Sequence, residues 1–76
     1  MMYTSADFRR DLESEMDNGY DIVRIARFAF MIYQKHGGGL SQELDEKVLQ
    51  VAAMEEGPEF EMTEDELRRF AKKLTS

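Results

Sequence analysis

The sequence predicts an all-α fold, a compact bundle of four helices at about residues 5–17, 21–36, 41–55 and 63–74. Two observations support this prediction. Apolar residues recur at spacings of three and four within each segment, which is the period of an amphipathic helix. Capping residues and glycines stand at the segment boundaries, where helices begin and end. Because the turns are short and no linker is present, residues 1–76 are expected to form a single domain.

The first predicted helix, residues 5–17, presents one narrow apolar stripe. Thr4 stands before it with Asp7 three positions later, a spacing that approximates a capping box. An Asn-Gly pair follows the helix and can turn the chain. A single stripe suits a helix that covers the core with one face. The stripe consists of Phe8, Leu12 and Met16.

The second predicted helix, residues 21–36, is expected to be the central one. Asp21 caps its start, and Gly37 is expected to take the left-handed conformation at its end. Apolar residues cover most of its circumference, and a helix of this kind must be enclosed by its neighbours. Only one polar stripe with a methionine in its middle is expected to be exposed. The stripe consists of Arg24, Arg27, Met31, Gln34 and Lys35.

The third predicted helix, residues 41–55, begins at the capping residue Ser41 and ends before a Gly-Pro pair, which cannot continue a helix. The next residues, 59–62, alternate polar and apolar side chains. Alternation is the period of a strand, but four residues without a partner strand are better explained as an extended connector. We expect Phe60 to turn from this connector into the core.

The last predicted helix, residues 63–74, has the clearest start. Thr63 and Glu66 have the spacing of a capping box, in which each side chain binds the backbone of the other residue. Acidic residues precede basic ones along this helix, in the order that the helix dipole favours. Its apolar face consists of Leu67, Phe70, Ala71 and Leu74.

Composition excludes several classes of protein. Sixteen acidic and ten basic residues give a net charge of −6, which repels the phosphates of nucleic acids at long range. Cysteine is absent, so neither a disulfide nor a thiolate metal site can form. The longest apolar run is too short for a membrane span and contains arginines. The first residues lack the pattern of a secretory signal, so we expect a cytoplasmic protein.

The sequence offers few groups for catalysis. It contains one histidine and no cysteine, whereas an enzyme needs a nucleophile, a base or a metal in a defined constellation. The glycines at 37–39 follow a helix, where a phosphate-binding loop would follow a strand. The acidic stretch 55–66 lacks the alternating ligands of an EF-hand loop. We therefore expect no enzyme, no catalytic residue, no cofactor and no metal site.

The acidic stretch is the main candidate for a partner-binding site, because it carries acids throughout and no base. It is either a solvated surface or a docking site, in which acids steer a basic protein and apolar groups anchor it. The methionine in the polar stripe of the second helix is a further candidate. The expected partner-binding residues are Met31, Glu55, Glu56, Glu59, Phe60 and Glu61.

Two functions therefore remain open. The favoured one is a small acidic protein–protein interaction module, an inhibitor or adaptor of a basic protein. The alternative is a dimeric helix-turn-helix DNA-binding regulator with residues 42–55 as its recognition helix. That helix begins with Glu43, Asp45 and Glu46, which oppose phosphate contacts. Six methionines and eight Phe and Tyr residues also suggest a homodimer, if some of them stay exposed.

Overall fold

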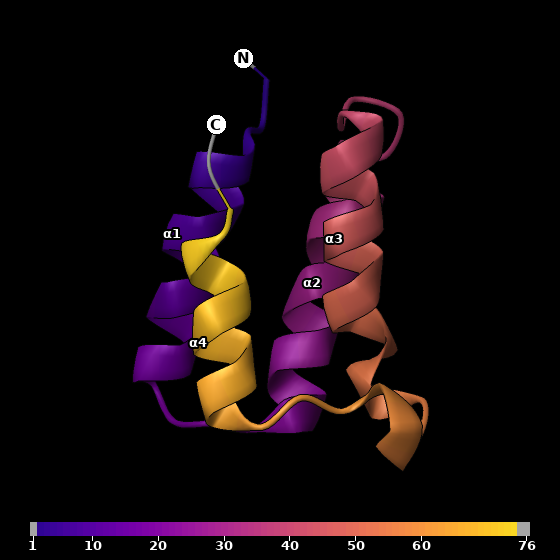
Figure 1. Cartoon of the computed structure of the whole chain (residues 1–76). Coiled ribbons are helices and arrows are strands. Elements are labelled where there is room, and N and C mark those ends of the chain that lie inside the picture. The colour runs from indigo at the N-terminus through magenta and orange to yellow at the C-terminus, as the bar shows by residue number, and fades with distance from the viewer. Residues whose placement is uncertain (1, 75–76) are drawn as a thin grey trace.

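Four α-helices and two single-turn 3-10 helices form the computed structural model, which describes residues 2–74. The predicted all-α fold class is confirmed, and the described residues contain no strand. The helices run alternately up and down, so α1 begins at the end of the bundle where α4 finishes (Figure 1). The elements are α1 (Ser5–Asp17), α2 (Ile22–His36), α3 (Gln42–Ala52), η1 (Ala53–Glu55), η2 (Pro58–Phe60) and α4 (Glu64–Lys72).

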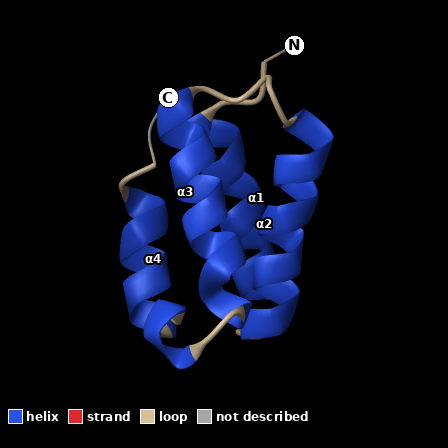
Figure 2. Ribbon diagram, turned by 90° about the vertical axis from the view of Figure 1, so that its right-hand side faces the viewer, coloured by secondary structure: helices blue, strands red, loops and turns tan. Residues whose placement is uncertain are grey.

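The second helix has the most neighbours. α2 packs against α3 over its most extensive surface, and also against α1 and η1, while α4 packs against α1. Figure 2 shows the bundle from the side, with η1 and η2 gathered at the end opposite the chain termini. None of the helices in the described part of the chain is long and apolar enough to cross a membrane.

The core is made of apolar side chains from all four helices and η1. Between residues 2 and 74 no buried residue is polar or charged. The rings of Phe8 and Phe28 stack with centroids 6.0 Å apart, which joins α1 to α2. The buried residues are Phe8, Leu12, Met16, Ile25, Ala26, Ala29, Ile32, Leu44, Val48, Val51, Met54, Leu67, Ala71 and Leu74.

The predicted helix caps are present. Thr4 and Thr63 each form a full capping box, and Asp21 and Ser41 accept hydrogen bonds from the first turns of α2 and α3. In the box of α4, the Thr63 amide donates to Glu66 Oε1 at 2.9 Å, and the Glu66 amide donates to Thr63 Oγ1 at 3.2 Å. At each of these helix starts, a side chain therefore accepts from one backbone N–H group that has no partner within the helix.

Two predicted helix ends and one predicted cap differ from the structure. The second helix ends at His36 as expected, whereas α4 ends at Lys72 and not at residue 74. Gly38, rather than Gly37, has the positive φ of +81° after α2. The third helix ends at Ala52 and not at residue 55, because the chain tightens into the 3-10 turn η1, as helix C-termini often do. This turn places Met54 in the core with no exposed surface.

The expectation that α2 is enclosed is also wrong. Val23 and Phe30 are 47% and 48% exposed, although both were expected to be covered. They stand seven residues apart and therefore lie along one side of the helix. α1, α3 and η1 pack on the inner side of α2, and the remaining helix, α4, packs on α1 rather than on the outer side of α2.

We expect that Thr63→Ala lowers the free energy of unfolding by about 1 kcal/mol, because it removes the side-chain acceptor of the α4 cap. Thr63→Ser keeps the hydroxyl and should stay within a few tenths of a kcal/mol of the parent protein. Urea unfolding followed by circular dichroism measures both. Equal losses in the two variants would contradict the cap's contribution.

The free energy of unfolding should fall in acid, because the two capping carboxylates become protonated there. Hydrogen bonds from the backbone and side chain of Thr4 lower the pKa of Asp7, and those of Thr63 lower the pKa of Glu66. A carboxyl group whose pKa is lower in the folded state contributes stability above its ordinary pKa, and loses it as the pH falls through the folded value. The ordinary pKa values are 3.8 and 4.5.

Urea unfolding at several pH values below 5 should therefore show a smaller loss of stability in the double variant Asp7→Asn/Glu66→Gln than in the parent protein. Both substitutions keep a carbonyl acceptor for the caps but cannot be protonated in this range. Parallel pH curves for the two proteins would show that these carboxylates are not the source of the acid sensitivity.

Candidate functional site

The acidic segment after α3 folds into two consecutive 3-10 turns at one end of the bundle (Figure 1). The Glu56 amide donates to the carbonyl of Ala53 at 2.9 Å, and the Phe60 amide donates to the carbonyl of Gly57 at 3.0 Å. These local bonds give the segment a defined shape. We name four of its exposed residues the acidic tip: Glu56, Glu59, Phe60 and Glu61.

Phe60 does not enter the core, which corrects the expectation from the sequence. Pro58 begins the turn η2 and Phe60 ends it, so the chain is coiled here rather than extended. The aromatic side chain is 49% exposed. Met62, the next apolar residue, packs against the core in its place. The structure therefore presents an aromatic side chain between two exposed acids, Glu59 and Glu61.

Contacts on both sides of the tip fix it to the bundle. Before it, Met54 is completely buried. After it, the Tyr20 hydroxyl donates to the carbonyl of Met62. Burial raises the pKa of Tyr20, and the charge of Glu61 acts in the same direction, so the hydroxyl keeps its proton at neutral pH. The tip is therefore held at a fixed place relative to α2.

Glu55 differs from the other acids of this segment. Its Oε2 lies 3.8 Å from Nε of Arg27 on α2, so a base offsets part of its charge. Within residues 2–74, Glu56, Glu59 and Glu61 form no ion pair. The uncompensated negative charge of the segment is therefore concentrated at the acidic tip.

Met31 lies on the outer side of α2 and is 53% exposed, as the polar stripe predicted. Met31 belongs to a second exposed surface, which we name the α2–α3 face. This face is defined by Val23, Arg27, Phe30 and Met31 on α2, and by Leu49, Ala52 and Glu55 at the α3 side. The sequence reasoning missed Val23 and Phe30 as surface residues, whereas Leu49 was recognised as lying off the buried face of its helix. The spacing of seven between Val23 and Phe30 was the available signal.

A cavity of about 420 Å³ lies in the middle of the α2–α3 face. It lies between the solvent-facing sides of α2 and α3, which run antiparallel, and the ion-paired side chains of Arg27 and Glu55 are among the groups that line it. Phe30 contributes a large ring to its lining from α2, and Ala52 contributes a single methyl group from α3. The lining residues are Arg27, Phe30, Ala52, Glu55 and Glu56.

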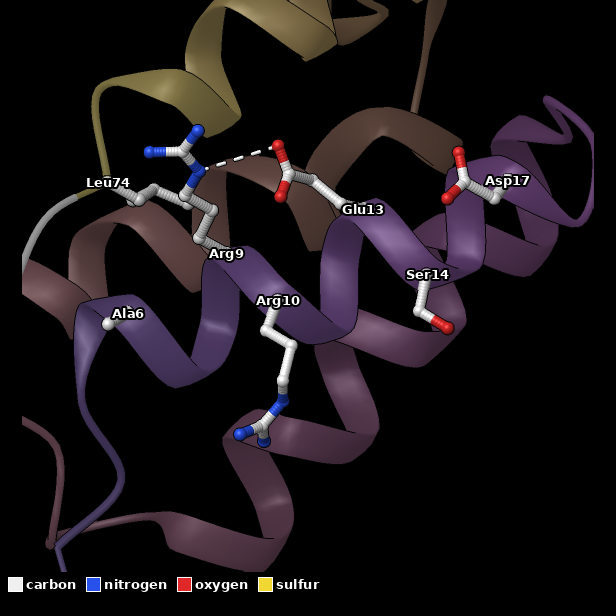
Figure 3. A pocket seen from close by; sticks show the side chains of 7 residues that line it. All are labelled: Ala6, Arg9, Arg10, Glu13, Ser14, Asp17 and Leu74. Atoms are coloured by element: carbon white, nitrogen blue, oxygen red, sulfur yellow. Dashed lines mark hydrogen bonds and ion pairs between the residues drawn. The ribbon is translucent and has the colours of Figure 1, made fainter.

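A groove of about 500 Å³ on α1 is also lined by two arginines, each of which is paired with carboxylates of the same helix (Figure 3). Arg9 reaches toward Glu13, with Nε 3.4 Å from Oε2, whereas Arg10 points to the opposite side of the helix. Arg10 forms ion pairs with Asp7 and Asp11 at 3.4 and 3.1 Å. Neighbouring carboxylates therefore offset both guanidinium charges. Among the described residues, no three acids or histidines are grouped closely enough to hold a metal ion.

Because Phe60 is half-exposed and Met54 is completely buried, replacing each with alanine should change stability by very different amounts. Phe60→Ala should change the free energy of unfolding by less than about 0.5 kcal/mol, as is usual for exposed positions. Met54→Ala should lower it by about 2 to 5 kcal/mol, because it leaves a cavity in the core. Urea unfolding of both variants measures the difference. A large loss in Phe60→Ala would place the ring in the core and contradict an exposed tip.

The structure presents two exposed surfaces with different charges. The acidic tip carries uncompensated acids around one aromatic ring, and the α2–α3 face carries apolar groups around one ion pair. Comparisons of this chain with protein-family models, with curated proteins and with solved structures give no match.

Proposed function

We propose that this chain is a protein–protein interaction module that binds a basic segment of another protein at the acidic tip. The observation that carries the proposal is the exposure of Phe60 between Glu59 and Glu61 on a turn that is fixed to the bundle. An aromatic anchor surrounded by charges of one sign is an arrangement found at protein interfaces.

The acids and the ring would contribute in different ways. The negative charges of Glu56, Glu59 and Glu61 are part of a net charge of −6. The resulting negative potential speeds the approach of a basic partner. Phe60 would supply affinity, because a partner that covers its exposed half gains on the order of 1 kcal/mol from apolar burial alone. The basic segment should therefore contain an apolar residue beside its lysines or arginines.

Such binding gives the module a simple mode of action. By covering a basic surface, the chain would block the other ligands of that surface, as an inhibitor does, or would bring the bundle to it, as an adaptor does. The alternative of DNA binding gains no support from the described residues. The exposed start of α3 carries Glu43 and Glu46, and Lys47 of the same helix lies over the ring of Phe70 at 5.6 Å.

A titration with a defined peptide tests the proposal. The probe is a short peptide in which lysine alternates with leucine, and the readout is the set of backbone NMR signals of the full chain at low salt. We expect shifts centred on residues 56–62 and an affinity that falls as salt is added. Phe60→Ala should weaken binding about tenfold, the usual effect of losing a central anchor.

Matched charge variants separate the site from general acidity. Glu59→Lys/Glu61→Lys should abolish the response, whereas Glu43→Lys/Glu46→Lys, with the same change of net charge on α3, should reduce it only through the long-range field. Equal losses in the two double variants, or peptide-induced shifts elsewhere on the bundle, would contradict binding at the acidic tip.

A further inference from the structure

We propose that the α2–α3 face is the contact between two copies of this chain, related by a two-fold axis that runs parallel to α2 and α3. The face combines exposed apolar groups, a cavity and a complementary pair of charges. The cavity shares one lining residue, Glu56, with the acidic tip, but the proposed contact uses neither Glu56 nor Phe60, so it does not depend on the function proposed above.

Both helices contribute exposed apolar side chains to the face. Val23 and Phe30 are seven residues apart on α2, and Arg27 lies between them on the same side. On α3, Leu49 stands three residues before Ala52 and therefore lies on the side of Ala52, which lines the cavity. Leu49 is 38% exposed. Exposed apolar surface of this extent is typical of interfaces.

Charge selects a second copy as the partner. Across the face, the α2 side carries Arg27 and the α3 side carries Glu55, and their side chains approach within 3.8 Å. The Arg27 side chain is nonetheless 74% exposed, so it retains donors for a further carboxylate. Arg27 and Glu55 lie at the same height, that is, at the same level along the bundle axis. If a second copy packs on this face with its α2 over α3 of the first, each Arg27 meets Glu55 of the other copy, so the face is complementary to itself.

The direction of the symmetry axis follows from this pairing. An axis parallel to the helices sets α2 of each copy over α3 of the other and keeps every residue at its own height. Arg27 of one copy then lies opposite Glu55 of the second, twice in the dimer. An axis perpendicular to the helices would instead set α2 over α2 and α3 over α3, so neither Arg27 would lie opposite Glu55 of the second copy.

The cavity gives the same arrangement an apolar centre. Phe30 and Ala52 line it from opposite sides and thus lie at similar heights along the two helices. The parallel axis therefore brings Phe30 of the second copy over Ala52, where the methyl side chain leaves the most room. Insertion of a side chain from one helix between those of a facing pair is the packing mode of helical bundles.

The dimensions of the face indicate a reversible dimer. A helix of 15 residues such as α2 is about 22 Å long, and two packed helices present a width of about 20 Å. This gives about 450 Å² on each copy, less than the roughly 800 Å² of a standard interface. We expect a dissociation constant on the order of 10 to 100 µM.

Sedimentation equilibrium of the full chain at about 5 to 500 µM in 0.15 M salt tests the proposal, with the Debye length near 8 Å. The parent protein should pass from monomer to dimer in this range. Phe30→Asp should raise the dissociation constant at least about a hundredfold, since both copies lose the central ring, while circular dichroism shows an unchanged fold. A parent protein that stays monomeric at all concentrations would overturn the proposal.

Exchange of charges tests the symmetry. Arg27→Glu and Glu55→Arg should each raise the dissociation constant about tenfold or more, because every dimer then contains two repelling pairs. An equimolar mixture of the two variants should dimerise at least as well as the parent protein, since both intermolecular pairs are restored. The ion pair within each chain remains broken in the mixture, so recovery reports the contact between copies alone.

Two controls complete the design. Arg9→Glu and Glu13→Arg change a comparable pair on α1, at 3.4 Å, and mixing them should leave the dissociation constant within about twofold of the parent value. Similar recovery in this control mixture would show that net charge drives the effect and would overturn the assigned face. The Phe60→Ala variant should dimerise with the same dissociation constant as the parent protein. The experiments therefore distinguish a wrong binding site at the acidic tip from a wrong dimer contact.

Discussion

The packing of α2 on α3 is the contact on which the rest of the structure depends. Ala26 and Ala29 are fully buried on α2, and residues this small allow a neighbouring backbone to approach closely. Val48 and Val51 are buried on α3. This contact fixes the height of η1, and η1 fixes the turn from which the acidic tip projects. The position of the tip is therefore a consequence of core packing.

The same packing explains why an apolar surface is left over. A chain of 76 residues can bury only about 60% of the surface of its unfolded state. α1, α3 and η1 cover one side of α2, and α4 is used to cover α1 instead. The outer side, with Phe30 at its centre, remains in solvent. Sequence reasoning recognised the apolar surface of α2 but could not count the helix faces available to cover it.

Local features were predicted more reliably than the direction of side chains. A capping box is formed within four residues, so Thr4 and Thr63 could be identified from the sequence alone. The burial of Met54 and the exposure of Phe60 depend on η1 and η2, two short turns without a regular sequence period. The extended connector predicted for 59–62 is therefore wrong for residues 59 and 60, which lie in η2, whereas Glu61 has an extended backbone. The acidic character of the segment was evident from the sequence.

The two proposed surfaces fit together geometrically. A symmetry axis parallel to the helices keeps the two copies in the same direction, so both acidic tips would lie at the same end of the dimer. Two binding sites that face the same way can engage neighbouring basic segments of one partner at once, which raises the apparent affinity without a new contact. Weak dimerisation and weak binding at the acidic tip would then strengthen each other, because a partner that binds both tips also stabilises the dimer.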